Sequence, residues 1–208
     1  MTEKEWLEER KKGIGGSDAA AIIAKNPWKN NVELWEEKTG KREIKDLSDN
    51  PNVTYGKEME AILRESFKIK YPQYEVLHEE NSIIKHSKYP FLFASLDGIL
   101  IDKQTGEMGV LEIKTANIVQ SMQKEKWSKG VPDNYFCQCL HYLNVTNFTF
   151  AKVFAELKYN NDYYILRTYD IDRNEHEDDI KYLEKQEIEF WKNYVEKDIR
   201  PPLELPQI

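Results

Sequence analysis

Two short apolar runs separated by a polar turn constrain the fold more than any other feature of this sequence. They lie in residues 95–115, SLDGILIDKQTGEMGVLEIKT. If they form antiparallel strands about a turn centred between Gln104 and Thr105, residues whose numbers sum to 209 face one another. Asp97 then lies opposite Glu112, with Cβ atoms about 4.5–5.5 Å apart. Two carboxylates at that distance repel, so the pairing predicts that a cation lies between them.

The second of these strands separates a polar face from an apolar one. Because side chains alternate along a strand, Lys114 shares a face with Glu112, while Leu111 and Ile113 point to the opposite face. Two carboxylates with backbone carbonyls suit Mg²⁺ or Mn²⁺, and a neighbouring ammonium group can hold water or neutralise a phosphate. The segment therefore indicates phosphodiester hydrolysis. The pattern is short, however. The alternative interpretation is that Asp97 and Gly98 form a turn and that Glu112 and Lys114 lie on a solvated strand face.

The residues before this segment predict helices. Thr2 and Glu5 form a capping box at the start of the first helix, and Ser17 is the expected N-cap of the second. The third repeats this pattern, and the last is long and amphipathic. These helices are expected at residues 2–13, 17–26, 32–40 and 53–71, with a polar loop over 41–52.

The residues from 74 onward predict strands interrupted by helices. The expected elements are a meander of antiparallel strands over 74–114, helices at 117–126 and 134–144, a hairpin of 148–157 and 162–171 around Asn160 and Asn161, and a terminal helix over 173–197. Such a mixture indicates an α/β or α+β fold, with a central mixed sheet flanked by helices. We expect residues 1–208 to form one domain.

Composition and charge decide between classes of protein. The chain has 208 residues, of which 40% are hydrophobic and 12% aromatic, enough for a packed core. The net charge of −7 argues at first against a nucleic-acid partner. Residues 172–198 carry ten acidic and five basic side chains, however, which leaves −2 for the remainder. No apolar run approaches the ~20 residues of a membrane span, and the MTEKEW start lacks a signal-peptide pattern, so we expect a cytoplasmic protein without a membrane partner.

The sequence lacks several common cofactor motifs. Cys137 and Cys139 are two residues apart and would point to different faces of a helix, which excludes a joint metal site. The histidines show no HExxH spacing, which argues against a zinc hydrolase. No GxxxxGK[ST] run occurs, so ATP is not an expected cofactor.

Five short blocks carry a resemblance to a known family. They are GIGGSDAAAI at 13–22, YGKEME at 55–60, SLDG at 95–98, LEIKT at 111–115 and YFCQCLHY at 135–142. In this order and spacing they resemble the YqaJ-like viral recombinase family, to which phage lambda exonuclease is related, within the PD-(D/E)XK nuclease superfamily. The likeness covers about residues 6–155 and implies a restriction-endonuclease-like core. The hairpin and acidic helix over 156–208 lie beyond it.

The resemblance implies roles for the residues of the acidic strand pair. Asp97 and Glu112 would be metal ligands, assisted by the carbonyl of Ile113, and Lys114 would be the catalytic lysine. Family members commonly have SPDG where this chain has SLDG at 95–98. The strand therefore enters Asp97 without the fixed φ of a proline, for which we expect a small change in geometry and no loss of activity.

Two helices contribute further candidates. The resemblance implies that Glu60 is the helix-borne acid that completes the metal site or positions water, with Glu58 as its rival. These two are about 200° apart on a helix, so both cannot face one metal. The family's helix glutamine corresponds to Gln138, which would orient Lys114 or a DNA phosphate. Tyr135 and Tyr142 share its stripe, and ordinary core packing is the better interpretation of both.

The resemblance also implies a site for the 5′ phosphate of DNA. Ser17 corresponds to the serine that receives this phosphate, and Arg10 to an arginine that pairs with it. A helix N-terminus supports this, since it offers unpaired N–H groups to an anion. A plain N-cap and a surface arginine are the alternative. Three tryptophans, Trp28, Trp35 and Trp127, are expected to be buried rather than to stack on DNA bases.

The implied activity is that of a Mg²⁺-dependent deoxyribonuclease, with Mn²⁺ as a substitute. It would digest linear double-stranded DNA from 5′ ends and expose 3′ strands for a phage single-strand annealing protein, as a ring-shaped homotrimer in a bacterial host's cytoplasm. An endonuclease or structure-selective nuclease of the same fold is one alternative. A non-catalytic DNA-binding module is another, and the intact set of two acids and a lysine argues against it.

Overall fold

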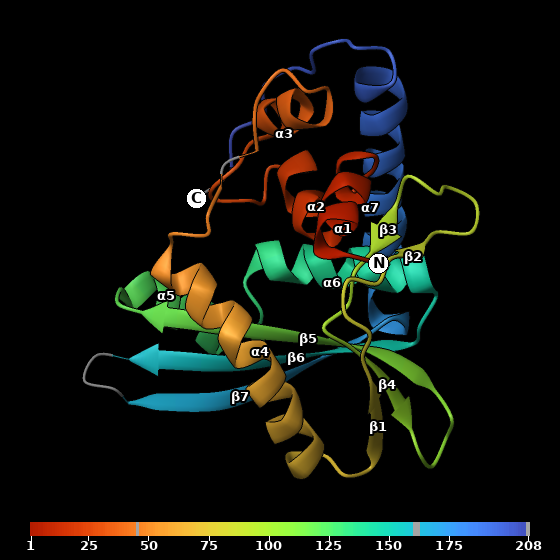
Figure 1. Cartoon of the computed structure of the whole chain (residues 1–208). Helices are drawn as coiled ribbons and strands as arrows, with labels where there is room; N and C mark the ends of the chain where they lie inside the picture. Colours follow the sequence, from red (N-terminus) through yellow and green to blue (C-terminus); the bar gives the residue numbers. More distant parts are fainter. Residues whose placement is uncertain (45, 160–162, 207–208) are drawn as a thin grey trace.

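A mixed β-sheet forms the centre of the protein (Figure 1). The computed structural model describes residues 1–44, 46–159 and 163–206. Over these ranges the sheet has five strands in the order β1 (Tyr74–Leu77), β4 (Gly98–Asp102), β5 (Met108–Ile118), β6 (Phe150–Tyr159) and β7 (Tyr164–Asp172). β5 and β6 are parallel, and the other neighbours are antiparallel. The predicted mixed sheet is confirmed.

The hairpin of β4 and β5 has the register that the sequence predicts. Gly98 pairs with Leu111 and Ile101 with Met108, so paired residue numbers sum to 209. Asp97, directly before β4, therefore lies opposite Glu112. Because register decides which side chains share a face, this pairing brings the two carboxylates to one end of the hairpin.

Helices cover both faces of the sheet. They are α1 (Glu3–Lys11), α2 (Gly16–Ile22), α3 (Asn31–Lys38), α4 (Pro51–Lys70), α5 (Ser121–Lys129), α6 (Asp133–Thr146) and α7 (Glu177–Phe190). Alternation along β6 supplies both interfaces. Phe154 packs against Phe67 of α4, with ring centroids 5.4 Å apart, while Val153 belongs to the opposite core, which includes Leu143 of α6.

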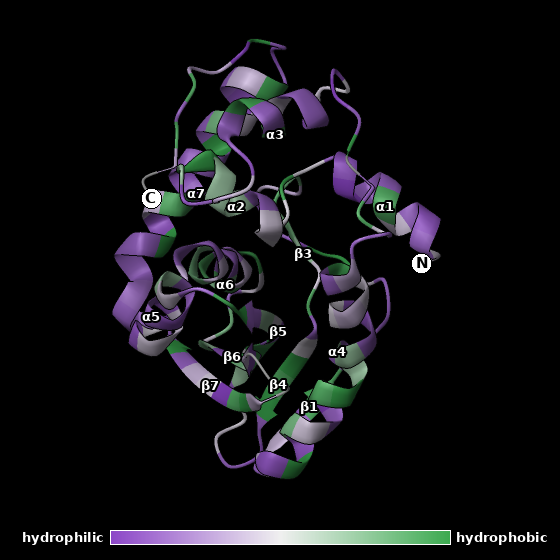
Figure 2. Cartoon of the chain, turned by 90° about the vertical axis from the view of Figure 1, so that its left-hand side faces the viewer, coloured by the Kyte–Doolittle hydropathy of each residue, from purple (hydrophilic) through white to green (hydrophobic). Residues whose placement is uncertain are grey.

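The opposite core continues beyond α6 into a further layer of helices. Figure 1 shows α6 between the sheet and the group that contains α2, α3 and α7. His141 of α6 joins these parts, since its Nδ1 lies 2.6 Å from Glu187 Oε1 and its Nε2 lies 2.8 Å from the Phe93 carbonyl oxygen. Helix α1 buries no residue, and Figure 2 shows it mostly hydrophilic. Within the described ranges, no helix has the length and apolar character needed to cross a bilayer.

The predicted meander of antiparallel strands is partly wrong. Among the described residues, β2 (Ile84–Lys85) and β3 (Phe93–Ala94) leave the main sheet and pair with each other. An isolated parallel bridge joins Leu92 to Ile14, whose N–H donates to the Phe91 carbonyl at 2.6 Å. The glycine-rich turn after α1 therefore contacts the segment that leads into β3.

Several helix boundaries also differ from the predictions. The second helix ends at Ile22 rather than near residue 26. The predicted helix over 117–126 is wrong at its start, because β5 continues to Ile118 by pairing with β6, and α5 begins only at Ser121. The terminal helix has a 3₁₀ turn at Asn174–His176 and a π-helical segment at Trp191–Val195. The turn predicted at Asn160 and Asn161 falls outside the described residues.

The close approach of α2 to α6 provides a test of this packing. A Cβ atom on Gly16 would lie 2.5 Å from Tyr142 Cε1 and 2.9 Å from Gln138 Cγ. Because Tyr142 is buried and cannot move aside, we expect Gly16→Ala to lower the free energy of unfolding by about 1–3 kcal/mol. Urea unfolding measures this, with Ser17→Ala at the neighbouring exposed position as the control. Equal stability of the two variants would contradict the observed packing.

Candidate active site

A cavity of about 500 Å³ lies where the start of β4, the middle of β5, α4, α6 and the turn between α1 and α2 meet. The side chains that the sequence predicts as functional all line it: Arg10, Ser17, Glu60, Asp97, Glu112, Lys114 and Gln138. Glu58, the rival of Glu60, is exposed and does not line it. The fold therefore gathers the candidates into one place, while their roles stay predictions.

Glu112 lies at the buried end of this cavity. Its side chain is 1% exposed, and its Oε1 contacts Lys114 Nζ. Gln138 Nε2 donates to the same oxygen at 2.7 Å. Gln138 therefore contacts Glu112, whereas the sequence-based prediction was that it orients Lys114 or a DNA phosphate. Among the described residues, Glu112 Oε2 has no hydrogen-bond partner. A buried carboxylate oxygen without a partner is costly, and a bound cation would satisfy it.

Asp97 is held beside Glu112 by backbone contacts. Its Oδ2 accepts a hydrogen bond from the Ile113 N–H at 2.7 Å, and its own carbonyl accepts one from Arg64 Nε at 2.7 Å. Because the N–H and C=O of a strand residue point to the same edge, the Ile113 carbonyl also points toward the side where Asp97 lies. The proposed backbone ligand is thus directed toward the acidic pair.

Glu60 reaches the cavity from α4. It is partly buried and forms an ion pair with Arg64, one helical turn further on. Arg64 is 8% exposed and contacts both Glu60 and the Asp97 backbone. Arg64 was not among the residues predicted from the sequence, although its spacing of four residues from Glu60 is a detectable signal.

The three acids share one electrostatic environment. Burial, followed by the charge of Asp97, raises the pKa of Glu112 to about 8 and that of Glu60 to about 7. Burial also raises the pKa of Asp97. For Lys114, burial alone would lower the pKa, but the charges of Glu112 and Asp97 raise it above its ordinary value. The positive charges of Lys114 and Arg64 are therefore not enough to offset the burial and mutual repulsion of the three acids.

The acidic side chains do not converge as a preformed ligand set. In the described part of the chain, no three His, Cys, Asp or Glu side chains are arranged to hold a metal ion. The reason is visible in the contacts, since Glu60 is turned to Arg64 and Glu112 to Lys114. Metal binding by all three acids would require these two ion pairs to rearrange.

Arg10 and Ser17 line the same cavity. Arg10 Nη2 donates to Ser17 Oγ at 3.1 Å, which places the two predicted phosphate ligands together. The prediction that Ser17 is the N-cap is wrong, because Gly15 is the N-cap and its N–H donates to Asp18 Oδ2 at 3.1 Å. Ser17 instead lies in the first turn of α2, where it is the exposed residue among buried neighbours.

Two residues that the sequence analysis gave no role fix the position of Arg10. Lys38 of α3 lies 2.7 Å from Asp18 Oδ2 and donates to the Arg10 carbonyl at 3.0 Å. The Trp6 ring lies 4.5 Å from Arg10 Cζ, and its Nε1 donates to Ser95 Oγ at 3.1 Å. The contacts of Lys38 and the hydrogen bond from Trp6 to Ser95 join segments that are distant along the chain, so no local sequence signal reveals them. The contact between Trp6 and Arg10 is local, since the two residues are four apart in α1.

The aromatic residues near the site differ in their burial. Tyr142 is buried and accepts a hydrogen bond from Gln138 at 2.9 Å, as expected for core packing. Tyr135 is only partly buried, and its ring centroid lies 5.0 Å from Lys114 Nζ. Trp35 and Trp127 are buried as predicted, at 5% and 4% exposure. The prediction for Trp28 is wrong, since its side chain is 72% exposed.

The raised pKa of Glu112 predicts a pH dependence of stability. Because this pKa is about 8 in the folded protein and 4.5 ordinarily, the folded state keeps a proton that the unfolded chain loses. In EDTA, stability should therefore fall as pH rises from 6 to 9, and should fall less in Glu112→Gln. We expect the variant to be more stable than wild type at pH 9, by about 1 kcal/mol. Urea unfolding at both pH values tests this, with the exposed Glu75→Gln as control, and identical pH profiles would refute it.

Comparisons with known proteins agree with this geometry. Residues 5–149 match the family described as the YqaJ-like viral recombinase domain. The uncharacterized protein YqaJ of Bacillus subtilis (strain 168) is 32% identical over 195 residues, which cover 94% of this chain and 57% of that protein. This chain thus spans little more than half the length of that relative.

Solved structures resemble the fold. An alkaline exonuclease from Laribacter hongkongensis has a TM-score of 0.68 at 20% identity, with 94% of each chain covered. A phage-related exonuclease from Haemophilus somnus 129PT has a TM-score of 0.54 at 13% identity, covering 89% of this chain and 96% of that one. The fold is that of the PD-(D/E)XK proteins. By its family match, the chain belongs to the family of YqaJ-like viral recombinase domains.

Proposed function

We propose that the protein is a metal-dependent deoxyribonuclease that digests linear double-stranded DNA from 5′ ends. One observation carries the proposal: the cavity that holds Asp97, Glu112 and Lys114 also holds Arg10 and Ser17. Hydrolytic groups and a phosphate-binding pair therefore share one space. The family membership and the fold similarity to proteins described as exonucleases support the same activity.

The residues of the cavity fit a divalent cation. Asp97, Glu112 and the Ile113 carbonyl would hold it, with Glu60 as the further acid, and hard oxygen donors of this kind suit Mg²⁺ or Mn²⁺. The unpartnered Oε2 of Glu112 and the raised pKa values of the acids support this fit. A bound cation of this type supplies Lewis acidity, which lowers the pKa of water and stabilises charge on a phosphate.

The side chains around the acids have separate tasks in this mechanism. Lys114 is protonated, since its pKa lies above the ordinary value, and its ammonium would stabilise negative charge on the scissile phosphate. Gln138 would hold Glu112 in place through the hydrogen bond to Oε1. Arg64 would hold the Asp97 backbone and balance the charge of Glu60.

Arg10 and Ser17 would bind the terminal 5′ phosphate. A guanidinium and a hydroxyl group can both donate to phosphate oxygens. Since these two groups lie 3.1 Å apart, a single phosphate would be within reach of both. Because the pair lies in the same cavity as Lys114, a strand held by its 5′ phosphate would present a nearby phosphodiester to the acids. This arrangement would set the direction of digestion.

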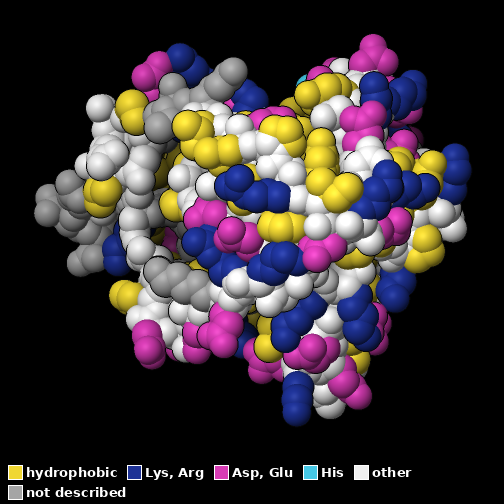
Figure 3. All heavy atoms as spheres, turned by 90° about the horizontal axis from the view of Figure 1, so that it is seen from above, with side chains coloured by type: hydrophobic (Ala, Val, Ile, Leu, Met, Phe, Trp, Pro, Cys, Tyr) yellow, Lys and Arg dark blue, Asp and Glu magenta, His cyan; other side chains and the backbone are white. Residues whose placement is uncertain are grey.

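On the face seen from above, surface charge does not mark a DNA-binding region. Figure 3 shows Lys and Arg side chains interspersed with Asp and Glu over the face seen from above, rather than gathered in one patch. The proposal therefore rests on the cavity and not on net charge. The ring-shaped homotrimer and the annealing-protein partner stay predictions from the family resemblance.

A panel of DNA substrates tests the proposed activity. We expect loss of linear duplex from 5′ ends with Mg²⁺ or Mn²⁺, no loss in EDTA, and intact closed circles. Asp97→Asn should reduce the rate at least 100-fold, because it removes one carboxylate that the cation requires. Glu107→Gln, an exposed change in the same hairpin, should retain activity.

The panel also distinguishes the alternatives. Cleavage of closed circles would favour an endonuclease. Absence of metal-dependent cleavage, together with equal DNA binding in Mg²⁺ and EDTA, would favour a non-catalytic binding module. Either result would overturn the exonuclease proposal.

The phosphate-binding pair makes a separate prediction. Wild type should digest 5′-phosphorylated ends faster than 5′-hydroxyl ends, and Arg10→Gln or Ser17→Ala should reduce this preference about tenfold, because each removes one donor. The matched control is Lys11→Gln, which removes a neighbouring charge that pairs with Glu8. Equal rates on both ends for wild type would remove this role from Arg10 and Ser17.

A further inference from the structure

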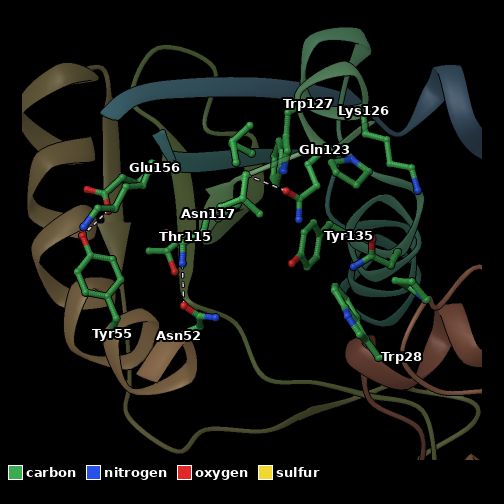
Figure 4. Close-up of a pocket in the computed structure, with 17 residues that line it drawn as sticks. Trp28, Asn52, Tyr55, Thr115, Asn117, Gln123, Lys126, Trp127, Tyr135 and Glu156 are labelled. Carbon is green, nitrogen blue, oxygen red and sulfur yellow. Dashed lines mark hydrogen bonds between the residues drawn. The ribbon is translucent and has the colours of Figure 1, made fainter. Parts of the chain in front are cut away.

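A second cavity lies beside the catalytic one. Its volume is about 630 Å³, within the range of small-molecule sites. Figure 4 shows Tyr135 and Trp28 on one side of it and Tyr55 across from them. Trp28 comes from the loop after α2, Tyr135 from α6 and Tyr55 from α4, so three separate segments present aromatic rings to the same space.

Tyr135 connects the two cavities. Its ring lines the second cavity and its centroid lies 5.0 Å from Nζ of Lys114, which lines the first. The next residue of β5, Thr115, also lines the second cavity. A polymer with a phosphate at Lys114 would therefore have its neighbouring unit beside Tyr135.

The polar groups of the second cavity suit the edges of nucleobases. Asn117 Nδ2 donates to Asn52 Oδ1 at 2.7 Å. Gln123 accepts from the N–H groups of Val119 and Gln120 through Oε1, at 3.0 and 3.1 Å, and its amide nitrogen has no hydrogen-bond partner among residues 1–44, 46–159 and 163–206. Amides of this kind offer both donors and acceptors to a base.

The charge of the lining also favours DNA. Among the described lining residues the only carboxylate is Glu156. It is buried, and its Oε1 accepts a hydrogen bond from the Tyr55 hydroxyl at 2.6 Å. This hydrogen bond, followed by burial, raises the pKa of Tyr55 to about 12, so the phenol stays neutral. Lys126 and Lys158 also belong to the lining, which therefore does not repel phosphates.

Trp28 offers an exposed ring at the edge of the second cavity. This indole is 72% exposed, while the backbone beneath it is fixed by Asn26 Oδ1, which accepts from the N–H groups of Trp28 and Lys29 at 2.9 and 3.2 Å. An exposed aromatic ring on a held loop offers a stacking surface at a low cost in conformational entropy.

We propose that the second cavity is a subsite for unpaired nucleobases of the hydrolysed strand, with Trp28 stacking on a base adjacent to the scissile phosphate. This inference rests on the proposed nuclease function. Trp28 is then a positioning residue that holds the strand outside the duplex while its phosphate lies at Lys114.

Binding in EDTA tests the subsite without cleavage. The probe is a fluorescein-labelled, 5′-phosphorylated duplex whose terminal two nucleotides are unpaired thymidines, compared with one that carries two abasic residues there. Both have the same charge. Fluorescence anisotropy should show about tenfold tighter binding of the thymidine end by wild type, because stacking on an aromatic ring favours a base over a bare sugar.

Variants assign this discrimination to Trp28. We expect Trp28→Ala to bind both duplexes equally and Trp28→Phe to restore most of the preference. Tyr182→Ala, which removes another exposed aromatic side chain on α7, should behave as wild type. Circular dichroism melting would show that each variant is folded.

The outcomes separate this inference from the proposed function. Equal binding of both duplexes by wild type, or unchanged discrimination in Trp28→Ala, would overturn the subsite even if the enzyme cleaves DNA with Mg²⁺. Base discrimination that Trp28→Ala abolishes would support it, even if wild type showed no cleavage in Mg²⁺ or Mn²⁺ and the nuclease proposal failed.

Discussion

The structure depends on placing two carboxylates opposite each other in the hairpin of β4 and β5. The register forces Asp97 toward Glu112, and Glu112 is buried, so water cannot compensate their repulsion. Three further side chains supply compensating groups. Lys114 shares the strand with Glu112, Gln138 reaches it from α6, and Arg64 reaches the Asp97 backbone from α4. The helices that flank the sheet are thus tied to the acidic pair as well as to the hydrophobic core.

The position of the site follows from the two-sided packing of the sheet. One face of β5 and β6 packs against α4, and the other packs under α6. Glu60 and Arg64 reach the cavity from the α4 side, while Glu112 and Gln138 lie on the α6 side. These groups meet where β4 begins. Side chains from the two layers therefore come together near the start of β4, where the sheet no longer separates them.

The proposed phosphate-binding pair of Arg10 and Ser17 depends on a different set of contacts. Lys38 holds Asp18 and the Arg10 carbonyl together, which links the end of α1 to the start of α2. Gly16 then allows α2 to approach Tyr142 and Gln138 on α6. Since Gln138 also holds Glu112, the phosphate-binding pair and the acids are connected through one helix. Tyr135, whose ring lies beside Lys114, lines the second cavity, so α6 borders both cavities proposed to bind DNA.

The sequence by itself determined those features that depend on neighbours along the chain or across one short turn. Strand alternation, the register of a single hairpin and helical spacing sufficed to predict the faces of β5, the pairing of Asp97 with Glu112 and the stripe of Gln138. Only the tertiary structure decided the rest. Pairing with β6 carried β5 through Ile118, Gly15 rather than Ser17 became the N-cap of α2 because its N–H donates to Asp18, and Trp28 became exposed. Each of these depends on partners distant in sequence or on competition between adjacent polar groups. Local sequence patterns do not specify which of these partners the folded chain brings into contact.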